Sequence, residues 1–126
     1  MKLEINIIKS LLADIENSAD YPEPFIINKV DGVEADSVTI NYHLVLMIEA
    51  GLISGLEKIN HDKRYVLVER MTWAGHDFLA NAKNPDIWKR FEEASSSFGS
   101  FSINILQSAL TNIAYSQINQ MTAAIA

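Results

Sequence analysis

Apolar residues near the N-terminus recur at intervals of three and four, the spacing that puts them on one face of a helix over residues 3–17. They are Ile5, Ile8, Leu11, Leu12 and Ile15. The stretch SADYPEP then interrupts the pattern with two prolines, which end the helix. The β-prone run FIINKV (25–30) follows and is closed by the turn signal Asp31-Gly32. The N-terminal part therefore predicts a helix and then a short strand.

A second helix is predicted over residues 37–50, because Asp36 is suited to cap its N-terminus and Gly51 stands just past its end. The face centred on Leu44 is expected to be buried. Its other members are Ile40, Met47 and Ile48. The strand-like runs LISGLEKI and RYVLVERM come next, and NHDK between them is expected to form the tip of a hairpin.

Two further helices are predicted after the hairpin. Thr72 can cap a helix over residues 73–83, and Asn84 can cap the next one, with Pro85 at its first position. The small residues SSSFGS (95–100) then read as a linker. A final amphipathic helix is expected over residues 101–124.

The order helix, strand, helix, hairpin, helix is that of an α+β, winged-helix-like domain. We therefore expect such a domain over residues 1–94, a Ser/Gly linker over 95–100, and a C-terminal amphipathic helix within 101–126. The segment between Val30 and Ser37 leaves little room for the first helix of a complete helix-turn-helix.

Two segments carry a family resemblance: YHLVLMIEAGLISG (42–55) and MTWAGHDFLANAKNPDIWKR (71–90). Together with the opening MKLEINIIKSLLADIEN, they resemble the family known as domain of unknown function 2513, over roughly residues 1–93. The resemblance implies a winged-helix-like fold, a small protein typical of phages and bacterial mobile elements, and no established activity. The family pattern predicts lysines within residues 94–126. This sequence has none there, so the segment departs from the pattern.

The amino-acid composition excludes several kinds of functional site. The absence of cysteine excludes disulfides, thiolate metal sites and a cysteine nucleophile. The N-terminus does not have the pattern of a signal peptide, and no apolar run approaches the length of a membrane span, so we expect a location in the cytoplasm of a bacterial host. The net charge of −6 makes the placement of the ten positive residues decisive for nucleic-acid binding.

The outward face of the 37–50 helix leaves two interpretations open. A DNA-reading helix usually presents Arg, Lys, Asn, Gln or Ser to base edges, whereas this helix has no basic residue. Its candidates for polar base contacts are Asn41, Tyr42 and His43. An apolar outer surface is more typical of contact with protein, either another chain or the C-terminal helix. The candidate partner-binding residues are Val38, Tyr42, Val45 and Leu46.

The hairpin carries most of the positive charge near this helix. Its candidates for DNA contact are Lys58, His61, Lys63, Arg64 and Arg70. A wing over the phosphate backbone could use Lys63 and Arg64, and the four Lys and Arg side chains allow at most about four phosphate contacts. Acidic residues alternate with these cations, and the simpler interpretation is a solvated turn.

The segment from Ala94 to Ala126 has no charged side chain. Its apolar stripe consists of Ile103, Leu106, Leu110, Ile113, Met121 and Ile125. A membrane-surface helix would carry Lys or Arg on its polar side, so we expect no membrane binding. Self-association through this stripe, giving a homo-oligomer, and packing within the same chain both remain open.

The sequence indicates no catalytic or metal site. His61-Asp62 and His76-Asp77 lack the spacing of a metal-binding motif, and the serines at 95–97 have no histidine or lysine at nucleophile spacing. We therefore expect no enzyme, no cofactor and no metal. The favoured function is a non-enzymatic interaction module that binds another protein, in a phage setting including a host factor. The alternative is a DNA-binding regulator using the 37–50 helix and the 58–70 wing.

Overall fold

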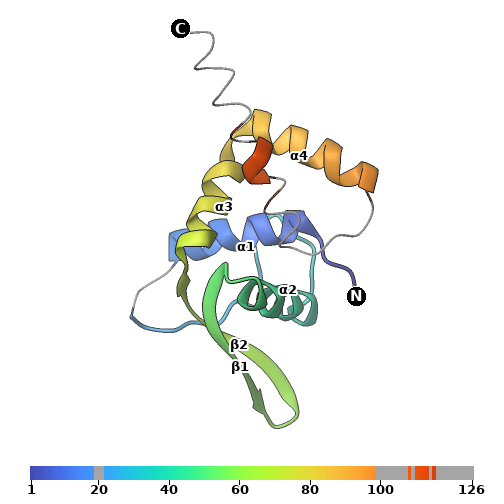
Figure 1. Cartoon of the computed structure of the whole chain (residues 1–126). Coiled ribbons are helices and arrows are strands. Elements are labelled where there is room, and N and C mark those ends of the chain that lie inside the picture. Colours follow the sequence, from blue (N-terminus) through green and yellow to red (C-terminus); the bar gives the residue numbers. More distant parts are fainter. Residues whose placement is uncertain (19–21, 99–107, 109, 114, 116–126) are drawn as a thin grey trace, which may run out of the picture. The chain divides into compact units, whose positions relative to one another are not determined.

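The chain has an α+β, winged-helix-like arrangement, seen in a computed structural model that describes residues 1–18, 22–98, 108, 110–113 and 115 (Figure 1). Its elements are α1 (Ile5–Ser18), α2 (Ser37–Glu49), β1 (Ile53–Asn60), β2 (Lys63–Met71), α3 (Trp73–Lys83) and α4 (Pro85–Phe98). These divide between two compact units, residues 1–76 and residues 77–126. The predicted hairpin and the four helices predicted before residue 99 are thus confirmed.

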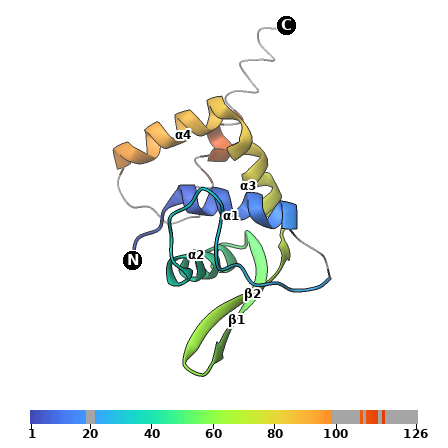
Figure 2. The ribbon, with the colours of Figure 1, turned by 180° about the vertical axis from the view of Figure 1, so that it is seen from behind.

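Within the first unit, α1 packs against α2, and α2 packs against both strands of the hairpin. Figures 1 and 2 show α1 and α2 side by side, with the hairpin projecting past α2 on the side away from α1. Four residues of the apolar stripe predicted for α1 are buried because they face this packing, whereas Ile5 is half-buried and Ile7, which was not predicted, is buried. The core of the unit is formed by Ile7, Ile8, Leu11, Leu12, Ile15, Ile40, Leu44, Met47, Leu52, Ile53, Val66 and Val68.

Helix α2 begins and ends as its caps predict. The side chain of Asp36 accepts a hydrogen bond from the backbone N–H of Thr39 at 2.8 Å, which satisfies one of the free donors of the first turn. Gly51 follows with a φ of +77°, a left-handed conformation that glycine adopts without strain.

The cap makes α2 sensitive to acid. Hydrogen bonds from Thr39 lower the pKa of Asp36 from its usual value of 3.8, and the bond from the backbone N–H has the largest effect. A carboxylate with a lowered folded-state pKa stabilises the fold above its unfolded pKa, and this stabilisation is lost as the pH falls through the folded value. Asp36→Ala should therefore lower the Tm at neutral pH, and the difference from wild type should shrink below pH ~4. Thermal melts across this range test the effect, with Glu34→Ala, an exposed carboxylate change outside the cap, showing no such convergence.

The hairpin joins β1 and β2 through a two-residue turn, His61 and Asp62, with φ angles of 50° and 64°. Positive φ at both positions gives the turn a twist that matches the strands. The cross-strand partners run from Asn60 opposite Lys63 at the tip to Ile53 opposite Met71 at the base. The predicted hairpin tip is therefore confirmed.

The β-prone run at 25–30 forms less strand than the sequence predicts. Phe25 makes one bridge to β2, exchanging backbone hydrogen bonds of 2.9 and 2.8 Å with Val68. Beyond it, Ile27 and Val30 are both buried. These two buried residues are three positions apart, whereas buried residues of a strand are two apart. The segment therefore leaves the sheet edge after the bridge.

The two segments that carry the family resemblance meet at the base of the hairpin. The backbone N–H of Thr72 donates to the carbonyl of Leu52 at 3.0 Å, and the Thr72 hydroxyl donates to the carbonyl of Gly51. The same hydroxyl oxygen accepts from the backbone N–H of Gly75 at 3.1 Å and so caps α3 as predicted. These bonds tie the end of α2 to the start of α3.

The second unit contains most of α3 and all of α4. Asn84 caps α4 by accepting from the backbone N–H groups of Asp86 and Ile87 at 3.0 and 3.2 Å. Helix α4 continues through Phe98, so residues 95–98 are helical and not the linker that the small residues suggest. Serine lowers helix propensity only modestly, and no glycine or proline interrupts the helix before Gly99.

Part of the predicted C-terminal helix lies within the described residues. Leu110 is buried and Ile113 half-buried, while Ser108, Asn112 and Tyr115 are exposed, all in helical conformation and on the predicted sides. The other members of the stripe, Ile103, Leu106, Met121 and Ile125, lie outside the described residues. Leu110 is only 1% exposed within a single chain, so its own chain already covers it. Among the described helices, none has both the length and the apolar character needed to cross a membrane.

Candidate functional site

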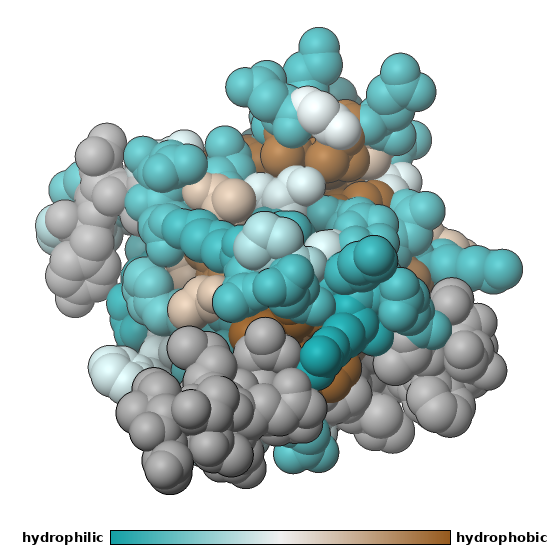
Figure 3. Space-filling view, turned by 90° about the horizontal axis from the view of Figure 1, so that it is seen from above, coloured by the Kyte–Doolittle hydropathy of each residue, from teal (hydrophilic) through white to brown (hydrophobic). Residues whose placement is uncertain are grey.

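Apolar side chains show only in small areas among hydrophilic ones on the face seen in Figure 3. An apolar hollow, with a volume of about 590 Å³, lies between the outer face of α2 and the hairpin. We call it the α2–hairpin groove. It is lined by Met1, Ser37, Val38, Asn41, Tyr42, Val45, Glu57, Asp62, Lys63 and Arg64. Its size falls in the range of about 300–1,000 Å³ that is typical of binding pockets.

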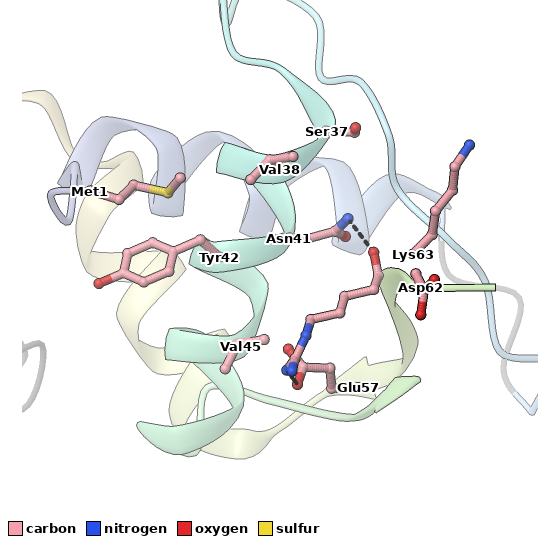
Figure 4. A pocket seen from close by; sticks show the side chains of 10 residues that line it. Met1, Ser37, Val38, Asn41, Tyr42, Val45, Glu57, Asp62 and Lys63 are labelled. Atoms are coloured by element: carbon pink, nitrogen blue, oxygen red, sulfur yellow. Dashed lines mark hydrogen bonds and ion pairs between the residues drawn. The ribbon is translucent and has the colours of Figure 1, made fainter. Parts of the chain in front are cut away.

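Helix α2 provides the apolar side of the groove. Val38, Asn41 and Val45 follow one another along the helix at helical spacing, and Tyr42 and Met1 lie on the side away from the hairpin (Figure 4). Val38 is 62% exposed and Tyr42 37% exposed. Large exposed apolar side chains that gather on one face are typical of contact with another molecule.

The hairpin provides a polar side with balanced charge. Arg64 Nη1 lies 3.1 Å from Glu57 Oε1, and Lys63 neighbours Asp62 in the turn region. Asn41 joins the two sides, because its Nδ2 donates to the carbonyl oxygen of Arg64 at 3.4 Å. Both groups of the ion pair are largely exposed, so the pair contributes little to stability. The ion pair does, however, partly neutralise Arg64, which is one of the two groove cations that could bind a phosphate.

His43 is not available to DNA, which corrects the interpretation of its ring as a candidate base contact. The side chain is fully buried, and both ring nitrogens are engaged. The backbone N–H of Glu4 donates to Nε2 at 2.9 Å, so Nδ1 carries the proton and donates to the carbonyl of Thr39 at 2.8 Å. The predicted flank of α2 turns inward here because the segment preceding α1 covers it.

The structure brings together some of the predicted site residues and separates others. Val38, Tyr42 and Val45, predicted for protein contact, line the groove with Asn41, Lys63 and Arg64, predicted for DNA contact. The candidates outside the groove lining are Leu46, which is half-buried, and the exposed Lys58, His61 and Arg70.

Strand geometry explains why two of these cations lie outside the groove. Lys58 follows Glu57 in β1, and successive side chains of a strand lie on opposite faces. Arg70 pairs with Ser54 at the base of the hairpin, six residues and about 20 Å along β2 from Arg64. The four cations counted from the sequence therefore do not form one surface.

Four lining residues were not among the predicted site residues: Met1, Ser37, Glu57 and Asp62. Strand alternation places Glu57 on the same face as Arg64, across a two-residue turn, so the sequence did contain a signal for it. Met1 reaches the groove because Glu4 is held by His43, and no local pattern indicates that bond. Within the described residues, no group of three His, Asp or Glu side chains could hold a metal ion.

The fold and the groove define the class: a small winged-helix-like protein with an exposed apolar helix face beside its hairpin. The family described as "Hypothetical protein (DUF2513)" matches residues 2–102, and the chain belongs to this family. The family resemblance seen in the sequence is thereby confirmed.

One relative spans almost the whole chain. The chain is 26% identical over 123 residues to a protein of Haemophilus influenzae (strain ATCC 51907 / DSM 11121 / KW20 / Rd) that bears the name "Uncharacterized protein". The similarity covers 98% of this chain and 100% of that protein. No solved structure matches the chain significantly.

Proposed function

We propose that this protein is a non-enzymatic interaction module that binds another protein through the α2–hairpin groove. One observation carries the proposal: the groove joins exposed apolar side chains of α2 to a hairpin wall whose charges are balanced. Such a surface gains free energy by burying apolar area, and Arg64 and Glu57 remain paired with each other when it is covered.

The geometry of the first unit supports a protein partner over DNA. Helix α2 carries no Lys or Arg, and His43 is buried. Residues 31–36 form a turn and no helix, so the element that crosses the DNA backbone in a helix-turn-helix is missing. At the groove, Arg64 is already paired with Glu57.

The interaction proposal predicts the effect of a charge placed in the groove. Tyr42→Asp and Val38→Asp should each weaken partner binding by at least about 30-fold, because a carboxylate would be buried in an apolar contact at a cost of roughly 2 kcal/mol or more. Leu56→Asp is the matched control, since Leu56 is 54% exposed and does not line the groove.

The measurement is quantitative mass spectrometry of proteins retained from a bacterial lysate by wild type and each variant. A specific partner should be lost with the two groove variants and retained with the control. A partner retained equally by all three variants would show that the groove is not the contact surface.

DNA binding is the second candidate, because Lys63 and Arg64 stand at the tip of a hairpin that projects past α2. Two cations in reach of phosphates give a slope of only about −2 in log affinity against log salt. Lys63→Ala with Arg64→Ala should abolish that slope and weaken binding on every sequence. Duplex binding at several salt concentrations measures it, and tight binding with a steep slope would favour the DNA candidate over the interaction module.

A further inference from the structure

Trp73 has an unusual position at the first turn of α3. It is 89% exposed, whereas the other tryptophan, Trp88, is 6% exposed. An aromatic side chain of this size buries about 150–250 Å² when it is covered, so leaving it in water forgoes a large apolar contribution. Its neighbours in sequence, Thr72 and Ala74, are small, so the indole ring projects beyond them.

The first unit thus combines an apolar projection with an apolar hollow. Trp73 and every residue that lines the α2–hairpin groove belong to residues 1–76. The groove's volume of about 590 Å³ leaves room for an aromatic ring. Two copies of the chain could therefore each present what the other accepts.

The groove chemistry fits an indole ring. Val38 and Val45 offer aliphatic surface, and Tyr42 offers an aromatic one. Arg64 lines the groove with a side chain that is 67% exposed, so the face of its guanidinium can contact a ring while its edge is paired with Glu57, and tryptophan is the best aromatic partner for a cation. Because Arg64 is already paired with Glu57, a neutral ring can cover this ion pair without leaving either of its charges unpaired. Trp, Tyr and Arg are also the residues that dominate binding energy and that pair with one another across interfaces.

We propose that the α2–hairpin groove of one copy binds Trp73 of a second copy. This inference rests on the proposed function and names the partner as the chain itself. If the exchange is reciprocal, the interface is isologous and two tryptophans are buried in one dimer. Each copy carries a net charge of −6, so the copies repel one another and salt should strengthen their association. DNA binding would respond to salt in the opposite direction.

The test is sedimentation velocity on the full chain over a wide range of concentration, at low and high salt. Wild type should dimerise, more tightly at high salt. Trp73→Ala should weaken the dimer by about 30-fold or more, as expected for a dominant interface residue. Tyr115→Ala is the matched control: Tyr115 is also an exposed aromatic residue, at 63%, and its loss should leave the dimer unchanged. Unchanged thermal melts will show that Trp73→Ala folds as wild type does.

A mixing experiment separates the two halves of the contact. Trp73→Ala keeps the groove and lacks the ring, while Tyr42→Asp keeps the ring and disrupts the groove. Neither should dimerise alone, but a mixture of the two should form a heterodimer through the one intact contact. A wild-type chain that stays monomeric, or a mixture that shows no association, would overturn the inference.

These outcomes are distinct from failure of the proposed function. A dimer that is lost with Tyr42→Asp and kept with Trp73→Ala would retain the groove as a binding site and reject Trp73 as its occupant. If the chain is monomeric but its groove variants still lose a lysate protein, the groove is again retained as a binding site and Trp73 is rejected as its occupant. Failure of the proposed function itself would require that the groove variants bind every partner as wild type does.

Discussion

Replacing Gly75 with alanine should destabilise the fold by about 3 kcal/mol and lower the Tm by about 10 °C. A Cβ at this position would lie far inside van der Waals distance of the carbonyl oxygen of Leu52, and 2.6 Å from Cγ of Met71. The side chain of Met71 can rotate away. The Leu52 carbonyl cannot move freely, because it accepts the hydrogen bond from the N–H of Thr72 that ties α3 to the end of α2.

The control for this change is Gly32→Ala. Gly32 has a φ of +80° but open space around its Cβ position, so the variant tests backbone strain without a steric clash. It should cost about 1 kcal/mol, as expected for a left-handed residue. Urea denaturation of the two variants measures both effects, and equal stabilities would contradict the close approach at Gly75.

His43→Ala should be as damaging, at about 4 kcal/mol, because it removes a fully buried ring and two hydrogen bonds. It leaves a cavity where α2 meets the segment that precedes α1, and the backbone N–H of Glu4 loses its acceptor. The Tyr42 ring, whose centroid lies 5.7 Å from that of His43 in an edge-to-face arrangement, loses its neighbour as well. Denaturant unfolding measures the loss of stability.

His43→Phe separates the two causes. It fills the site with a slightly larger aromatic ring that lacks both nitrogens, so it leaves no cavity and should cost about 1–3 kcal/mol, mainly the penalty of an unpaired polar group. Hydrogen exchange of the Glu4 amide should accelerate in both variants if the bond to Nε2 holds this segment in place. Unaltered exchange in His43→Phe would contradict the hydrogen bond as the anchor.

His43 also connects the core to the groove. Met1 lines the groove three residues before Glu4, whose N–H His43 holds. Tyr42, next to His43 in sequence, lines the same groove. Variants of His43 should therefore disturb binding at the groove as well as stability, whereas Gly75→Ala acts at Leu52, beyond the C-terminal end of α2. This difference helps to distinguish a change in the groove from a general loss of folded protein.

The sequence by itself determined most of the elements of this fold. The spacing of Ile5, Ile8, Leu11, Leu12 and Ile15 predicted α1 and its buried face. Asp36, Thr72 and Asn84 marked three helix starts, and the run NHDK marked the hairpin tip. These signals succeed because a cap, a turn and a helical face depend on residues within a few positions of one another. The apolar outer face of α2 could be predicted from the sequence for the same reason.

Only the tertiary structure decided which of these residues meet. The bond between Glu4 and His43 joins positions 39 residues apart and turned a candidate DNA contact into a core residue. The Cβ clash at Gly75 depends on Leu52, which lies 23 positions earlier in the chain. The pairing of Arg64 with Glu57 neutralised a cation that the sequence left available. Each of these contacts depends on how helices and strands pack across long separations, and packing of that kind leaves no periodic trace in the sequence.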